Sequence, residues 1–230
     1  MNLNFATGAA AVAALCLPVL LIFFGRLYKN GSLFTLFFYY LLNAVYNTMS
    51  LNIIVVPELF KSKAAAFFNY LDTPMMLLVL LFFCNEKWKR QMIIALLAIF
   101  LVFEMVIAVF FGLDRASSIY LLGPGTLLLL GLSIYFFAHY GKVSIVQGKG
   151  TGKTLMLVSI IFSYGCFLIL YYLHYLQRTT EVADVYLIYY IVTFISAVLM
   201  SLGLIWIIKR SRQINELLTT RKELALFFDK

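Results

Sequence analysis

The sequence predicts an all-α integral membrane protein: a seven-transmembrane helix bundle with its N-terminus outside, its C-terminus cytoplasmic, and a short C-terminal amphipathic helix. Three observations predict this class. Of the 230 residues, 63% are hydrophobic and only 12% are charged, whereas soluble domains have about 45–50% apolar and about 25% charged residues. Apolar runs of transmembrane length recur along the chain, and the basic residues alternate between the two sides that these runs define.

Seven apolar runs are each long enough for a transmembrane helix, which needs roughly 20 residues. They lie at about 5–28, 32–56, 62–84, 90–112, 117–140, 152–177 and 183–209. The run Met92–Val102 is apolar at every position, while a membrane β-barrel requires alternation. We therefore expect one helical domain over 1–209 and a cytoplasmic amphipathic tail over 210–230.

The distribution of Lys and Arg predicts the orientation. Fourteen of the 18 basic residues fall in the tail and in the loops on one side of the predicted bundle, and Lys61, Lys63, Arg115 and Arg178 fall on the other. Cytoplasmic loops carry the excess of Lys and Arg. The net charge of +8 thus indicates membrane topology and anionic lipid headgroups, not nucleic acid. A bacterial cytoplasmic membrane is the expected location.

Two acidic residues, Asp72 and Glu104, lie deep in the third and fourth predicted spans. Such residues are costly in a bilayer and commonly functional. No Lys or Arg lies at their depth, so each carboxyl must be protonated, hydrogen-bonded or neutralised by a bound cation. Asn69 shares a helix face with Asp72. We predict that these residues bind a ligand or protons, with packing contacts as the alternative.

Other polar residues gather in the second, sixth and seventh spans. Asn43, Asn47 and Ser50 recur at helical spacing, and we interpret them as a polar stripe that holds helices together. Helices six and seven add candidate ligand-binding residues in their outer halves: His174, Tyr172, Tyr189, Tyr190 and Thr193. Interfacial tyrosines are also typical of membrane proteins in general. The combined pattern predicts a pocket that opens outward.

Gly123, Pro124 and Gly125 lie in the first half of the fifth span. Glycine and proline weaken helices, and irregular backbone in a membrane is tolerated where it lines a cavity. We therefore expect a helix break that lines the pocket.

Seven spans in this orientation resemble the rhodopsins and the seven-helix receptors in topology. A retinal pigment needs a lysine inside the last helix, and the seventh span has only Lys209 at its rim. We therefore expect no retinal and predict no cofactor. His139 and His174 lie at opposite ends of the predicted bundle, which argues against a shared metal, and no catalytic residue is evident.

The favoured function is binding or sensing of a small ligand or of protons, with relay to the tail. A small-solute or proton-coupled transporter is the alternative, and a lipid-modifying enzyme is less favoured. Residues 210–230 combine basic side chains with apolar ones at helical spacing, such as Ile214, Leu217, Leu224 and Phe228. They are expected to lie on the membrane surface or to contact a second copy or a cytoplasmic partner.

Overall fold

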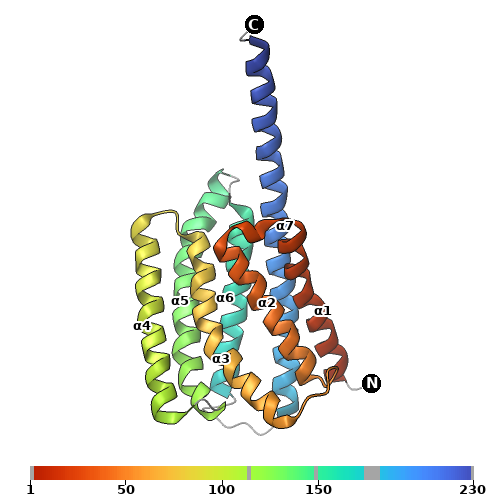
Figure 1. Ribbon diagram of the computed structural model, residues 1–230, viewed down its shortest axis with the longest axis vertical. Helices are drawn as coiled ribbons and strands as arrows, with labels where there is room; N and C mark the ends of the chain where they lie inside the picture. The colour runs from red at the N-terminus through yellow and green to blue at the C-terminus, as the bar shows by residue number, and fades with distance from the viewer. Residues whose placement is uncertain (1–2, 113–114, 148–149, 174–181, 229–230) are drawn as a thin grey trace.

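The computed structural model describes residues 3–112, 115–147, 150–173 and 182–228. Seven long helices run up and down in chain order and form one bundle (Figure 1). They are α1 (Leu3–Phe24), α2 (Gly31–Ser50), α3 (Glu58–Leu80), α4 (Lys87–Phe111), α5 (Arg115–Gln147), α6 (Thr151–Tyr171) and α7 (Val182–Phe228). Short 3₁₀ turns follow α1 and α3, η1 (Leu27–Lys29) and η2 (Leu81–Phe83).

Six segments of the described chain are long and apolar enough to cross a membrane: Leu3–Phe24, Glu58–Phe83, Lys87–Phe111, Ile119–Val146, Thr151–Tyr171 and Val185–Ile214. The protein is therefore a polytopic membrane helical bundle. The predicted second span is not among the six, because the tyrosines and asparagines of α2 lower its hydropathy. Nevertheless, α2 packs within the bundle against α1 and α3.

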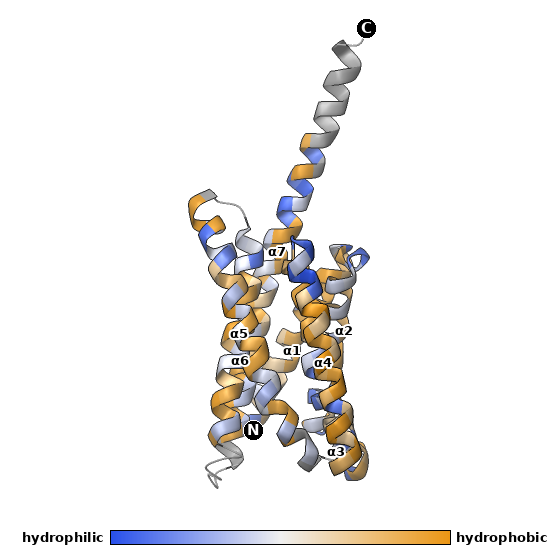
Figure 2. Cartoon of the chain, turned by 90° about the vertical axis from the view of Figure 1, so that its left-hand side faces the viewer, coloured by the Kyte–Doolittle hydropathy of each residue, from blue (hydrophilic) through white to orange (hydrophobic). Residues whose placement is uncertain are grey.

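Apolar side chains cover the outside of the bundle. Hydrophobic residues extend along most of the helix length, and hydrophilic residues gather where α7 leaves the bundle (Figure 2). On α4, which packs against α3 and α5, Val109 and Phe110 are 81% and 77% exposed. Phe34 and Phe38 on α2 are also exposed. So large an apolar surface would be unstable in water, and it indicates contact with the lipid bilayer.

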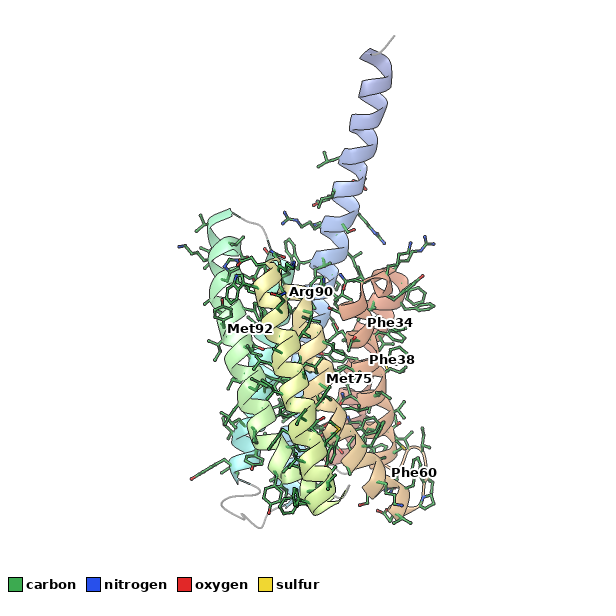
Figure 3. The ribbon with its side chains drawn as sticks, turned by 60° about the vertical axis from the view of Figure 1, so that its left-hand side comes forward. Phe34, Phe38, Phe60, Met75, Arg90 and Met92 are labelled. Carbon is green, nitrogen blue, oxygen red and sulfur yellow. The ribbon has the colours of Figure 1, made fainter. Side chains whose placement is uncertain are left out.

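Basic residues mark one end of the bundle. Figure 3 places Arg90 near this end and Phe60 near the opposite one. The up-and-down order of the helices puts Arg26, Lys29, Lys153 and Lys209 at the same end as Arg90. We call it the basic end.

The half of the bundle near the basic end is densely packed. Leu36, Leu77 and Leu204 are fully buried there. Phe83 packs against Phe136 and Tyr140, with ring centroids 6.3 and 6.1 Å apart. Dense packing at this end closes the bundle on the side from which α7 projects.

Two predicted boundaries differ from the structure. The second helix ends at Ser50, not near residue 56, because Asn52 adopts a left-handed conformation with φ 56° and Pro57 then precedes α3. The tail is not a separate helix: α7 runs without interruption from Val182 to Phe228 and projects beyond the bundle (Figure 1).

The predicted break at Gly123, Pro124 and Gly125 is also wrong, since α5 continues through all three residues. One proline removes only one helical hydrogen bond, and neighbouring helices hold the segment in place. A side chain at Gly123 would collide with Tyr171 of α6, and one at Gly125 would collide with Thr73 of α3. The glycines thus permit close helix packing.

Candidate functional site

A cavity of about 750 Å³ lies in the half of the bundle opposite the basic end. Side chains from α2, α3, α5, α6 and α7 form its walls, and Leu15 of α1 contributes as well. It extends from Leu15, Met76 and Met200, near the middle of the bundle, to Ser50 and Val185, near the opposite end. Its volume is in the range of small-molecule sites, about 300–1,000 Å³.

Asp72 lies in the wall of this cavity between two tyrosines. The Tyr39 hydroxyl of α2 donates a hydrogen bond to Oδ1 at 3.0 Å, and the Tyr164 hydroxyl of α6 donates one to Oδ2 at 3.0 Å. The two hydroxyl oxygens are 3.5 Å apart. Asp72 thereby links three helices through neutral donors, and these donors leave its charge uncompensated.

The described part of the cavity wall offers no positive charge to Asp72. Among the described residues that line it, none is Lys, Arg or His. A carboxylate in a low-dielectric site needs a cation or a proton. The site can therefore take up a positively charged group, or it can hold Asp72 in its protonated form.

The polar stripe of α2 also lines the cavity through Asn43, Tyr46, Asn47 and Ser50. Asn47 Nδ2 lies 2.8 Å from the Asn43 carbonyl oxygen and 3.4 Å from the Tyr189 hydroxyl of α7. This second contact connects two helices, as a packing role requires. However, Asn47 is 1% exposed and its Oδ1 has no hydrogen-bond partner in the described part of the chain, so one acceptor remains for a ligand or water.

Several other predicted site residues share the cavity. Asn69 lines it from α3, and Tyr189, Tyr190 and Thr193 line it from α7. The Tyr189 ring stacks on Phe167 of α6 with centroids 5.7 Å apart. The cavity wall at α6 and α7 is thus built from aromatic rings with hydroxyl groups beside them.

The other predicted site residues are not among the described residues that line the cavity. Glu104 is buried in α4 and does not line the cavity, and its Oε1 has no described hydrogen-bond partner. Phe100, one turn away, would contact a side chain at Gly125 of α5, so this face of α4 looks toward α5. Tyr172 is 50% exposed and lies outside the cavity lining. His174 lies outside the described residues.

Residues 123–125 do not line the cavity, although their neighbours Leu122 and Thr126 do. Thr126 donates its hydroxyl hydrogen within its own helix, toward the carbonyl oxygens of Leu122 at 2.7 Å and Gly123 at 2.9 Å. Such bonds satisfy the hydroxyl locally and leave little polarity on this wall.

Several polar residues of the cavity were not predicted from the sequence, among them Tyr39, Tyr40, Ser159, Ser163 and Tyr164. Tyr39 could have been found, because it precedes Asn43 by one helical turn and extends the same stripe. Tyr164 carries a weaker signal. It lies between Ser163 and Gly165, and only the i, i+8 spacing to Tyr172 relates it to a predicted site residue.

Comparison of the chain with models of known families, with curated proteins and with solved structures finds no match. The described residues contain no group of three or more His, Cys, Asp or Glu side chains that could hold a metal ion. The candidate function therefore depends on the cavity and its chemistry.

Proposed function

We propose that this protein is a receptor that spans the membrane seven times and binds a small organic cation in the cavity. In this proposal α2 crosses the membrane in addition to the six candidate spans. The N-terminus is outside, and the basic end faces the cytoplasm of a bacterial cell. The observation that carries the proposal is the Asp72 carboxyl group, which two neutral tyrosines hold in a cavity of about 750 Å³ whose described lining residues include no Lys, Arg or His.

The polarity of α2 supports its place in the membrane. Asn43, Tyr46, Asn47 and Ser50 lower the hydropathy of the helix, but these residues line the cavity. The opposite face carries Phe34 and Phe38, whose rings pack edge to face with centroids 4.8 Å apart. A helix with a polar inner face and an aromatic outer face suits a membrane span that borders a cavity.

Relay through α7 is the second part of the proposal. The cavity-lining residues Tyr189, Tyr190 and Thr193 lie on the same continuous helix as the projecting segment 210–228. A ligand that displaces these side chains would therefore move one end of a helix whose other end lies beyond the bundle. A second copy of the chain or a cytoplasmic protein would read this movement.

Proton-coupled transport through Asp72 is the second candidate, and one observation favours the receptor over it. The cavity ends near Met76 and Met200, and beyond it lies the packed cluster of Phe83, Phe136 and Tyr140. Transport would require this half to open. Lipid modification remains the less favoured alternative; it would need a reactive residue such as His174, which lies outside the described residues.

Ligand binding is tested by thermal unfolding of the purified protein with hexylamine or with 1-hexanol, a neutral molecule of similar shape. We expect hexylamine, but not hexanol, to raise the melting temperature. Asp72→Asn should abolish this rise, and Glu104→Gln, outside the cavity, should retain it. Equal stabilisation by amine and alcohol, or a rise that survives Asp72→Asn, would refute the proposed cation site.

Relay is tested with two spin labels, one at the exposed Leu217 on the projecting part of α7 and one at the exposed Trp88 on α4. Hexylamine should shift the distance distribution between the labels in the otherwise unaltered protein and leave it unchanged in Asp72→Asn. If saturating amine leaves the distance distribution unchanged, relay through α7 is refuted and only ligand binding remains.

A further inference from the structure

A second, smaller cavity of about 260 Å³ adjoins the main one at the end opposite the basic end. Tyr46, Ser50, Ala65 and Tyr186 line both cavities. The smaller cavity adds the polar residues Asn52, Glu58, Lys61 and Ser62 from the α2–α3 connection and the first turns of α3. It therefore forms a polar vestibule beside the cavity that contains Asp72.

Lys61 supplies the positive charge of the vestibule. Its Nζ donates hydrogen bonds to Glu58 Oε1 at 2.8 Å and to the side-chain oxygen of Asn52. The Lys61 side chain is only 16% exposed, whereas that of Glu58 is 88% exposed. An ammonium group has three N–H donors, and these two described bonds use two of them.

The ion pair between Lys61 and Glu58 is replaceable. The Glu58 partner is exposed, and water screens an exposed carboxylate and competes for its hydrogen bonds. An incoming carboxylate can therefore use the third donor of Lys61 or displace Glu58, while Asn52 keeps the ammonium in position.

Lys61 and Asp72 lie on the same face of α3. They are 11 residues apart, which is about three helical turns and about 16 Å along the axis. Between them Ala65, Phe68 and Asn69 line the main cavity. A single elongated molecule in the two adjoining cavities would thus meet a negative protein charge at one end and a positive one at the other.

We infer that the ligand is an elongated zwitterion, with its ammonium group at Asp72, an apolar middle along Phe68, and its carboxylate at Lys61. This inference rests on the proposed function and adds the substrate class and the orientation of the ligand. It assigns to Lys61 a direct contact with the ligand. The structural alternative is that Lys61 only fastens the α2–α3 connection through Asn52 and Glu58.

The test uses ω-aminocarboxylates from γ-aminobutanoate to ω-aminododecanoate, each compared with the n-alkylamine of the same carbon number. The protein is held in lipid nanodiscs, and all compounds are used below their micelle-forming concentrations. We expect the carboxylate to weaken binding in short compounds, which leave it within the apolar part of the cavity. In compounds that span the two charges it should tighten binding by about tenfold, since the carboxylate then accepts a charge-assisted hydrogen bond from Lys61.

Variants distinguish the carboxylate site from the amine site. Lys61→Gln, which keeps a donor for Asn52, should remove the tenfold gain and leave alkylamine binding unchanged. Lys61→Arg should retain most of the gain, and Lys63→Gln, two residues further along α3, serves as the matched control. If alkylamines bind through Asp72 but no carboxylate increases affinity, or if Lys61→Gln keeps the gain, the inference is refuted and the proposed function stands. If no amine binds, both are refuted.

Discussion

Helices α6 and α7 lie against each other very differently at their two ends. Near the basic end a Cβ atom on Gly203 would lie 2.9 Å from the Gly152 carbonyl oxygen, so the two backbones touch. Toward the other end Phe167 and Tyr189 stand between the helices as stacked rings, and the cavity opens beside them. Side-chain size accounts for this difference, since small residues let helices approach and aromatic rings hold them apart.

The largest effect should come from disturbing the closed end. Gly203→Ala would place a methyl group against Met156 Cγ at 2.7 Å and against the Gly152 backbone. We expect a loss of about 2–3 kcal/mol in the free energy of unfolding, because the helices must separate to admit it. Unfolding in mixed micelles measures this loss.

The matched control lies on α6 in the half that holds the cavity. A Cβ atom at Gly165 would meet nothing closer than Leu130 Cδ1 at 4.0 Å. Gly165→Ala should therefore be neutral or stabilise by up to about 1 kcal/mol through helix propensity. Similar losses in both variants would show that the two ends do not differ in packing.

A smaller effect is expected at the cavity. Tyr164→Phe removes the donor to Asp72 Oδ2 and should lower the free energy of unfolding by about 1–2 kcal/mol, since a buried carboxylate loses a hydrogen bond. In the Asp72→Asn background the same change should cost less. A double-mutant cycle measures the coupling, and strictly additive effects would argue against a functional Asp72–Tyr164 bond.

Lys153 offers a weaker test of the closed end. Its Nζ lies 3.2 Å from the Phe82 carbonyl oxygen and about 5 Å from two ring centroids, Phe82 at 4.8 Å and Tyr140 at 4.9 Å. Lys153→Met should cost about 1 kcal/mol, because it removes the donor and both cation–π contacts. The exposed Lys142 provides the control, and Lys142→Met should leave the melting temperature unchanged.

The smallest effect concerns Glu86, just before α4. Hydrogen bonds from Lys89 and Trp88 lower its pKa below the ordinary value of 4.5. A carboxyl whose pKa is lower in the folded state stabilises above its ordinary pKa, and this contribution disappears as the pH falls through the lowered value. Glu86→Gln should thus slightly lower the melting temperature at pH 7. Below the lowered pKa the two proteins should melt together, and a difference that persists there would exclude this charge effect.

The sequence predicts most of the fold, because helices that cross lipid must be apolar and therefore appear as long apolar runs. Six apolar runs correspond to candidate spans, but α2 does not reach the same hydropathy, because it carries Asn43, Tyr46 and Asn47 on the cavity wall. The continuity of α7 through Lys209 was not predictable, since the charged segment after it suits a surface helix as well as an extension.

The site was predictable where polarity is rare. Asp72, Asn43 and Asn47 are conspicuous in apolar segments, whereas a tyrosine such as Tyr164 is common in membrane proteins and gives no signal by itself. Glu104 was assigned to the pocket from its depth along α4, but depth does not determine which way a side chain points. That direction depends on helix packing, here on close contacts such as Gly125 with Phe100 and Thr73.

In the proposed relay, the close contact between Gly152 and Gly203 would be the pivot of α7. The arm from Tyr189 to Gly203 has 14 residues and the arm from Gly203 to Phe228 has 25, about 21 and 38 Å at about 1.5 Å per residue. A rigid rod pivoting there multiplies a displacement by about 1.8, the ratio of those arms, so a shift of about 1 Å at Tyr189 becomes nearly 2 Å at Phe228. The position of this contact along α7 would thus determine how far the projecting segment moves in the proposed relay.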